Sequence, residues 1–350
     1  MVTAVELLNI QTRYLLVLSV ILLIPGINLI NSYISKQINL AHVKVIVVSE
    51  ALATQGIFPF VATFMNNIEV RPDCNMIISR CNAEDFLNHA KPDLETLSAR
   101  YYEQIFQSSQ YTGFTTSTTL TDFYTAYHSN SYHPVAILGG INSDSTHFVN
   151  PQTPYVDMDS NYKADETPIK KNTSSEIMGL AVFQDDKLIG ELTGMDSICH
   201  LMCTNEFHST NISIPSPFHQ NHVFNLDLKK NKAPSIAVSL VNGSPYIQIT
   251  VSYLAFVSSM DEGLDVSNRE NLTIIEKYAA SYLQEKICQY LYKTSKEFHT
   301  DLVDFGKYLL PHYLTSDEIS HVNWLNRYSD ATFCVTAKVH VQGSYLIVKN

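Results

Sequence analysis

The sequence contains 350 residues, of which 45% are hydrophobic and 16% are charged, and this composition argues against a disordered chain. A chain of this length can bury one large core or two to three smaller ones. The 34 Asp and Glu residues outnumber the 23 Lys and Arg residues, giving a formal net charge of −11 that argues against binding to nucleic acid. The six cysteines are too few for a disulfide scaffold.

The N-terminal segment contains an uncharged, mostly apolar run over residues 15–24, followed by Pro25. This run is about half as long as the roughly twenty residues that a membrane-spanning helix requires. Its length fits the core of a signal peptide, but Glu6 and the single cation Arg13 make a poor charged region ahead of it. Two interpretations of residues 1–26 stay open: a signal or anchor segment, or a buried core element.

Residues 27–141 alternate between helix and strand patterns, which indicates an α/β or α+β layer. The run 43–48 is nearly all β-branched, as in a strand that is covered on both faces. We expect strands over 43–48, 76–78 and 135–138, and helices over 27–34, 50–56, 58–65, 85–108 and 121–128.

Residues 142–175 have almost no apolar periodicity and are rich in Asp, Ser, Asn, Thr and Pro. This composition predicts a long exposed connection and a domain boundary. Asp157 and Asp159 could form an Asp-x-Asp metal clamp within it. An ordinary solvated loop is the favoured interpretation, because the pair does not follow a strand.

The C-terminal half opens with a hairpin over 179–192, and turn propensity explains Asp185 and Asp186 at its tip. An antiparallel meander is expected next, with Asn242 and Gly243 at one turn. The apolar stripe of a long helix over 268–298 should face this sheet. The expected strands are 211–214, 223–228, 236–241, 246–253 and a final pair, 332–341 and 345–348, and the other helices are 196–203, 302–310 and 316–325.

No local signature of a common enzyme class occurs in the sequence. Cys199 and Cys203, with His200 between them, could be metal ligands, but no further ligand follows at a matching spacing, so buried or free thiols are favoured. The histidines are scattered, and the best placed is His42, directly before a buried strand. We therefore name no catalytic, cofactor-binding or metal-binding residue, and no cofactor.

Three ordered blocks of residues stand out in this sequence: His42, 43–48, Glu50, Ala53, Gly56 and Ile57; then Gly179, Ala181, Val182, Phe183, Lys187, Leu188, Gly190 and Leu192; and finally Asp301, Phe305, Gly306 and Trp324. In this order, they resemble the Ger(x)C family, the C subunits of spore germinant receptors. One departure from the family pattern is Asn66, where an arginine is expected ahead of Glu69 and Arg71.

The resemblance implies an α+β fold of mixed and antiparallel sheets flanked by helices, in two to three domains. These would be an N-terminal α/β domain over 27–141, an exposed connector over 142–175 and a C-terminal α+β domain over 176–350. It also implies a non-enzymatic receptor subunit, needed for nutrient-triggered germination of endospores. Such a subunit is associated with the outer face of the spore inner membrane and works with a permease-like A subunit and a multi-span B subunit. The matched glycines, Phe183 and Trp324 are expected to serve folding.

The N-terminus departs from the family, whose members begin with a secretion signal and a lipobox cysteine. The first cysteine in this sequence is Cys74, so a lipid anchor is not supported. A truncated first domain, a misassigned start and a direct hydrophobic anchor at 15–24 all stay open. The alternative function is a secreted enzyme or a solute-binding protein whose site is assembled from distant residues.

Overall fold

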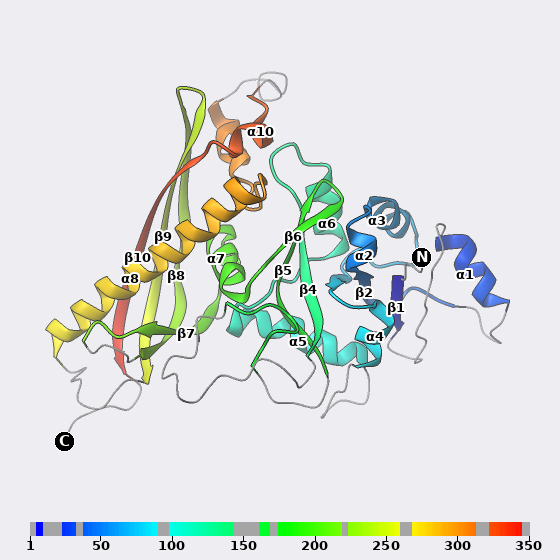
Figure 1. The fold of residues 1–350 in the computed structure, drawn as a ribbon, viewed down its shortest axis with the longest axis horizontal. Coiled ribbons are helices and arrows are strands. Elements are labelled where there is room, and N and C mark those ends of the chain that lie inside the picture. Colours follow the sequence, from blue (N-terminus) through cyan, green and yellow to red (C-terminus); the bar gives the residue numbers. More distant parts are fainter. Residues whose placement is uncertain are drawn as a thin grey trace.

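The structure is a computed structural model that describes residues 5–9, 23–32, 38–89, 98–142, 161–168, 174–218, 223–259, 268–312 and 322–344. In this part of the chain, two mixed sheets and their flanking helices form an elongated molecule (Figure 1). A six-stranded sheet lies toward the N-terminal end, with strand order β1-β2-β3-β4-β5-β6, and a four-stranded sheet of order β10-β9-β8-β7 lies at the other end. The expected α+β fold class is confirmed.

The six-stranded sheet has a parallel centre and antiparallel edges. β2, β3 and β4 run parallel because helices return the chain between them, whereas β1, β5 and β6 pair antiparallel with their neighbours. The strands are β1 (Val5–Asn9), β2 (Val43–Ser49), β3 (Asn75–Ser79), β4 (Val135–Asn142), β5 (Ser174–Gln184) and β6 (Lys187–Leu192).

Helices cover both faces of this sheet, as the β-branched sequence of β2 predicts. Phe64 and Phe123 pack in the core on one face, and Phe86 and Tyr102 in the core on the other. The expected helix over 85–108 corresponds to two helices, and residues 90–97 between them lie outside the described part. The helices are α1 (Leu23–Asn31), α2 (Glu50–Ala53), α3 (Phe58–Met65), α4 (Ala83–Asn88), α5 (Ser98–Thr112) and α6 (Leu120–Tyr127).

The hairpin that was expected to open the C-terminal domain continues the N-terminal sheet, because β5 pairs with β4 with Ala181 opposite Ala136. Part of the expected exposed connection also packs on this sheet. Ala164 is fully buried, and its N–H donates to the Met178 carbonyl at 3.0 Å. Gly140 allows this approach, since a Cβ there would lie 2.9 Å from the Ala164 carbonyl carbon. The domain boundaries stay a prediction.

The four-stranded sheet contains the expected antiparallel meander of β7, β8 and β9. Asn242 and Gly243, both with positive φ, form the turn from β8 to β9. The elements of this half are α7 (Gly194–Thr204), β7 (Ser209–Pro215), β8 (Val223–Val241), β9 (Ser244–Ser259), α8 (Arg269–Tyr292), a π-helical turn (Lys293–Glu297), the 3-10 helix η2 (Phe305–His312), α10 (Trp324–Tyr328) and β10 (Thr332–Ser344).

One expectation for this sheet was wrong, and one strand pairing was not predicted. The strands expected over 223–228 and 236–241 form the single strand β8, whose register shifts near Lys232 absorb Pro234. β10 pairs with β9 in parallel, so α8 is the crossover that returns the chain to the same end of the sheet. The strand expected over 345–348 lies outside the described residues, and so does most of the helix expected over 316–325.

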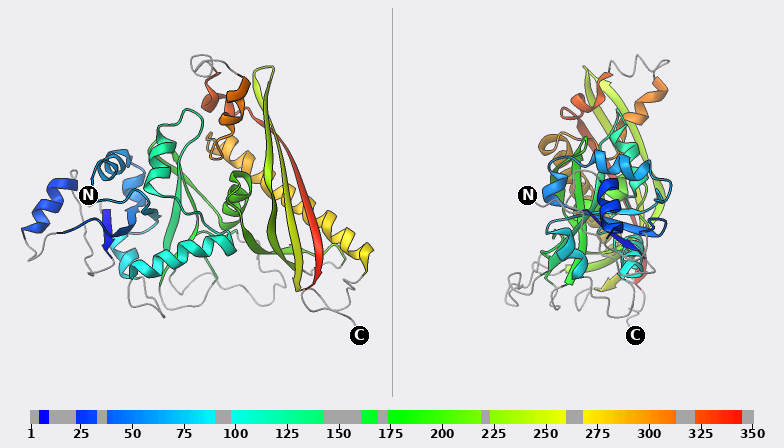
Figure 2. Two further views of the ribbon diagram at one scale, coloured as in Figure 1. Left: turned by 180° about the vertical axis from the view of Figure 1, so that it is seen from behind. Right: turned by 90° about the vertical axis from the view of Figure 1, so that its right-hand side faces the viewer.

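The apolar stripe of α8 faces the sheet, as the sequence predicts. Ile275, Ala279, Leu283 and Ile287 are buried in one core with the inward side chains of β9 and β10. α8 crosses one face of the sheet in Figure 1, and from behind the strands lie in front of it (Figure 2). Along β9, buried residues alternate with partly exposed ones, so the opposite face of the sheet points to solvent.

Candidate functional site

A cavity of about 290 Å³ lies where elements that flank the two sheets meet. Residues 116–118, α6 and the start of β4 line one side, and α7 with residues 302–307 lines the other. Its walls therefore come from both halves of the chain. Concave sites that join two structural units are common places for small-molecule binding.

Capping boxes fix the two helices that line the cavity. At α6, the N–H and the hydroxyl of Thr119 donate to Asp122 Oδ2 at 2.9 and 2.7 Å, and the Asp122 N–H donates to Thr119 Oγ1. Thr193 and Asp196 form the same box at α7. α7 ends at Asn205, which has a φ of 73°, and this turn leads directly into Glu206.

Two buried histidines line the cavity, one from each half of the chain. His200 on α7 is 4% exposed, its Nδ1 lies 2.8 Å from the Tyr290 hydroxyl, and burial lowers its pKa to about 4. His133, just before β4, is 7% exposed, and burial lowers its pKa against the opposing effect of Asp185, which lies 3.7 Å from Nε2. Both imidazoles are therefore neutral at neutral pH.

The charged groups of the cavity are mainly acidic. Glu206 is an exposed residue with a single long hydrogen bond among the described residues, from the Thr116 hydroxyl at 3.4 Å; partial desolvation of its carboxylate and the nearby Asp122 raise its pKa. Asp304 accepts from the Ser131 hydroxyl at 2.5 Å, and burial raises its pKa. The cavity can therefore offer carboxylate and imidazole acceptors to a bound molecule.

The described residues of the cavity contain no hydrolytic pair. Neither imidazole among them is hydrogen-bonded to a serine or threonine hydroxyl: His200 Nδ1 pairs with the Tyr290 hydroxyl, and His133 Nε2 lies 3.7 Å from Asp185. A nucleophile held by a general base is the arrangement that such chemistry requires.

Asp301 lies at the centre of a buried hydrogen-bond cluster beside the cavity. Its carboxylate accepts from the N–H groups of Val303, Asp304, Phe305 and Gly306 at 2.9, 3.0, 2.7 and 3.4 Å, and from the Trp324 indole N–H at 2.8 Å. Burial raises its pKa to about 7, although these donors favour the charged form.

Asp301, Phe305, Gly306 and Trp324, the last block that resembles the family, therefore form one structural unit. The Asp301 carboxylate accepts hydrogen bonds from the backbone of the loop and from the Trp324 indole. Gly306 is required there, because a Cβ would lie 2.9 Å from Trp324 Cδ1 and 2.7 Å from Ser131 Cβ.

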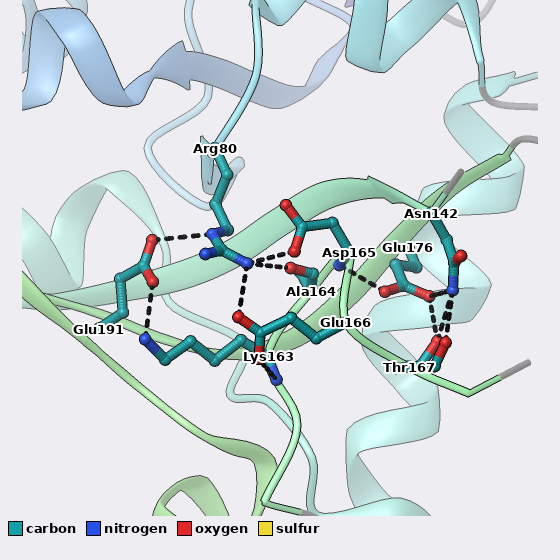
Figure 3. Close-up of polar contacts among 9 residues, drawn as sticks. All are labelled: Arg80, Asn142, Lys163, Ala164, Asp165, Glu166, Thr167, Glu176 and Glu191. Carbon is teal, nitrogen blue, oxygen red and sulfur yellow. Dashed lines mark hydrogen bonds and ion pairs between the residues drawn. The ribbon is translucent and has the colours of Figure 1, made fainter. Parts of the chain in front are cut away.

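A second polar cluster ties the segment 161–168 to the six-stranded sheet (Figure 3). Arg80 donates to the Ala164 carbonyl at 2.8 Å, contacts Asp165, and pairs with Glu166 and Glu191, each at 3.2 Å. Lys163 also pairs with Glu191, at 3.1 Å.

Glu176 on β5 extends this cluster. It accepts from the Asp165 N–H and from the Thr167 hydroxyl, and Asn142 donates to it at 3.1 Å. All four carboxylates of the cluster, those of Asp165, Glu166, Glu176 and Glu191, have a partner. We therefore interpret the cluster as a structural contact between the segment 161–168 and the sheet rather than as a binding site.

The structure brings together few of the residues that the sequence singled out as candidate ligands. Cys199 and Cys203 are buried free thiols, and no group of three possible metal ligands occurs among the described residues. His42 is exposed. Asp157 and Asp159 lie outside the described part of the chain.

Asp186 does more than form a turn, because its carbonyl accepts from the Ile57 N–H at 3.0 Å and its carboxylate from the Phe58 N–H at 3.2 Å. Sequence reasoning missed the cavity residues His133, Glu206 and Asp304. The only sequence pattern near these residues is the Thr-x-x-Asp capping box at the start of α6 and of α7, and it predicts a helix start rather than a cavity.

Two family models match the chain, in the order expected from the sequence blocks. The model described as "Spore germination protein N-terminal domain" matches residues 23–139, and the one described as "Spore germination B3/ GerAC like, C-terminal" matches residues 178–345. No curated protein matched the chain by sequence.

The fold is similar to the crystal structure of the GerBC protein, with a TM-score of 0.60 and 15% identity over 85% of this chain and 78% of that chain. Every helix in the described part of this chain is too short or too polar to cross a bilayer.

Proposed function

Since the chain belongs to the GerAC family of spore germination proteins, we propose that it works as the C subunit of a germinant receptor. Members of this family are germinant receptor subunits that are not known to be enzymes. In the proposed role the chain acts without catalysis, together with a permease-like A subunit and a multi-span B subunit, and is required for nutrient-triggered germination.

One observation carries this proposal: both family models match, in order, and between them cover most of the chain. The buried unit of Asp301, Phe305, Gly306 and Trp324 supports it, because residues chosen for their family resemblance meet in space.

We also propose a location at the outer face of the spore inner membrane, where the A and B subunits would hold the chain. The predicted organisation, with domains over 27–141 and 176–350 joined by the connector 142–175, belongs to this proposal. The Arg80 cluster and the pairing of β5 with β4 are consistent with two domains that are packed rigidly against each other.

Deletion of the gene in a strain without a redundant receptor tests the proposal. We expect the spores to lose germination with the nutrients that this receptor senses, and to germinate normally with a trigger that bypasses receptors. Restoration by the wild-type chain in trans is the control. A normal response of the deletion strain to every nutrient would overturn the proposal.

A further inference from the structure

The cavity between α6, β4, α7 and residues 302–307 combines features of a built binding site. Its volume of about 290 Å³ lies near the lower end of the roughly 300–1,000 Å³ range of small-molecule sites. Both halves of the chain contribute walls, so its shape depends on how they pack. A ligand that fits must be small.

Two nearly buried imidazoles line the cavity with unused hydrogen-bonding capacity. His133 Nδ1 has no partner among the described residues, but it has almost no accessible surface, so a molecule in the cavity cannot reach it. His200 uses Nδ1 for Tyr290, and its Nε2 has no hydrogen bond to the described part of the protein. Buried side chains normally use their polar atoms, so His200 Nε2 points to a polar ligand group.

The charges of the lining define the kind of group. Three carboxylates, those of Asp122, Glu206 and Asp304, face a single ammonium, that of Lys307, which lies 3.5 Å from Asp304. Asp122 is held by its capping box and Asp304 by Ser131, whereas Glu206 accepts one long hydrogen bond, from Thr116, and otherwise lies near the charges of Lys307 and His208 without an ion pair to either. Glu206 is therefore the carboxylate that is available to a ligand.

We propose that this cavity binds a small organic molecule that carries a protonated amine, with Glu206 as its charge partner. His200 Nε2 accepts from another of its donors, in the tautomer whose Nδ1–H donates to the Tyr290 hydroxyl. An ammonium group has three donors and no acceptor, which complements a lining rich in acceptors. This binding does not depend on the receptor role proposed above, since it follows from the cavity alone.

Titration of the purified full-length chain with putrescine tests the proposal, with butanediol as an uncharged analogue of the same length. The amide resonances of residues 116–118, 132–135, 200–206 and 302–307 report on the cavity. We expect putrescine to shift them saturably and butanediol to leave them in place.

The Glu206→Gln variant should bind putrescine about ten-fold more weakly, as expected for the loss of one charge-assisted hydrogen bond. Glu297→Gln is the matched control, because Glu297 is exposed and does not line the cavity. It makes the same change in net charge and should bind like the wild type. Unchanged cavity resonances, equal shifts with butanediol, or equal weakening in both variants would overturn the proposal.

Discussion

Asp301 shows how a single side chain can organise a loop in this protein. Its carboxylate is fully buried and satisfies four backbone N–H groups and the indole of Trp324. Such a group is costly to remove, because each donor would be left buried without an acceptor. The sequence resemblance identified Asp301 and Trp324 individually, and the structure supplies the physical reason for their spacing.

The Trp324→Phe variant should lose about 2 kcal/mol of unfolding free energy, because it keeps an aromatic ring but leaves a buried oxygen of Asp301 without its indole donor. Asp301→Asn should cost more, about 3 kcal/mol, since an amide cannot accept from all five donors. Chemical denaturation measures both effects.

Asp330→Asn is the matched control for Asp301→Asn, because Asp330 is exposed, and we expect its effect to stay within about 0.5 kcal/mol. Wild-type stability in Asp301→Asn would show that the carboxylate does not organise the loop.

His200 should make stability depend on pH. Burial lowers its pKa from 6.5 to about 4, so between these values the unfolded chain binds a proton that the folded chain does not. Its contribution is therefore fully present above pH 6.5 and is lost as the pH falls toward 4, by about 3 kcal/mol. Asp301 acts in the opposite direction, because burial raises its pKa from 3.8 to about 7.

Comparison with His200→Asn separates the two contributions, since both proteins retain Asp301. The difference in unfolding free energy between wild type and variant should shrink by about 3 kcal/mol from pH 6.5 to pH 4. A difference that is constant across this range would show that His200 titrates normally in the folded protein.

At the residue scale, the sequence alone identified residues that stabilise the fold, but it did not identify the residues that line the cavity. Trp324 and Gly306 stand in a recognisable local order. His133, Glu206 and Asp304 are separated by 70 or more positions in the chain. They meet only through the packing of the two halves, and a single sequence contains no signal for that packing.

At the scale of elements, periodicity predicted the strands and helices with regular exposure. β9 and α8 each present one apolar face, and both were expected correctly. β8 was divided in the prediction because the run of Lys and Asn residues up to Pro234 has the composition of a turn. The structure accommodates that run in register shifts of a continuous strand.

The parallel pairing of β10 could not be read from periodicity, because parallel and antiparallel strands share a repeat of two residues. α8 is the element that makes this pairing possible, since it returns the chain along one face of the sheet (Figure 1).

Leu283→Asp should therefore disrupt the C-terminal sheet. Leu283 lies on α8 and is 1% exposed in the core between this helix and the sheet. An unpaired carboxylate at this position costs at least about 4 kcal/mol. Gln284→Asp is the matched control, because its neighbouring position on the same helix is exposed. Thermal melting should show a large loss for Leu283→Asp alone, and equal melting of the two variants would show that this face of α8 is not buried.

At the scale of the whole molecule, the two halves share structure across the expected boundary. The C-terminal family model begins at residue 178, within β5, yet β5 belongs to the six-stranded sheet. α5 also reaches the second sheet, where the Thr210 hydroxyl donates to the Thr112 carbonyl at 2.5 Å. The cavity therefore lies between two halves of the chain that also contact each other through β5 and through α5.

Recovery of partner subunits tests the proposed role as the C subunit of a germinant receptor most directly. A tagged copy of the chain, expressed during sporulation, is isolated from detergent-solubilised spore inner membranes. We expect the A and B subunits encoded with it to copurify, and to be lost from the isolate when the tag is placed on an unrelated membrane-associated spore protein. Isolation of the folded chain without either subunit, from membranes that contain both, would contradict the account.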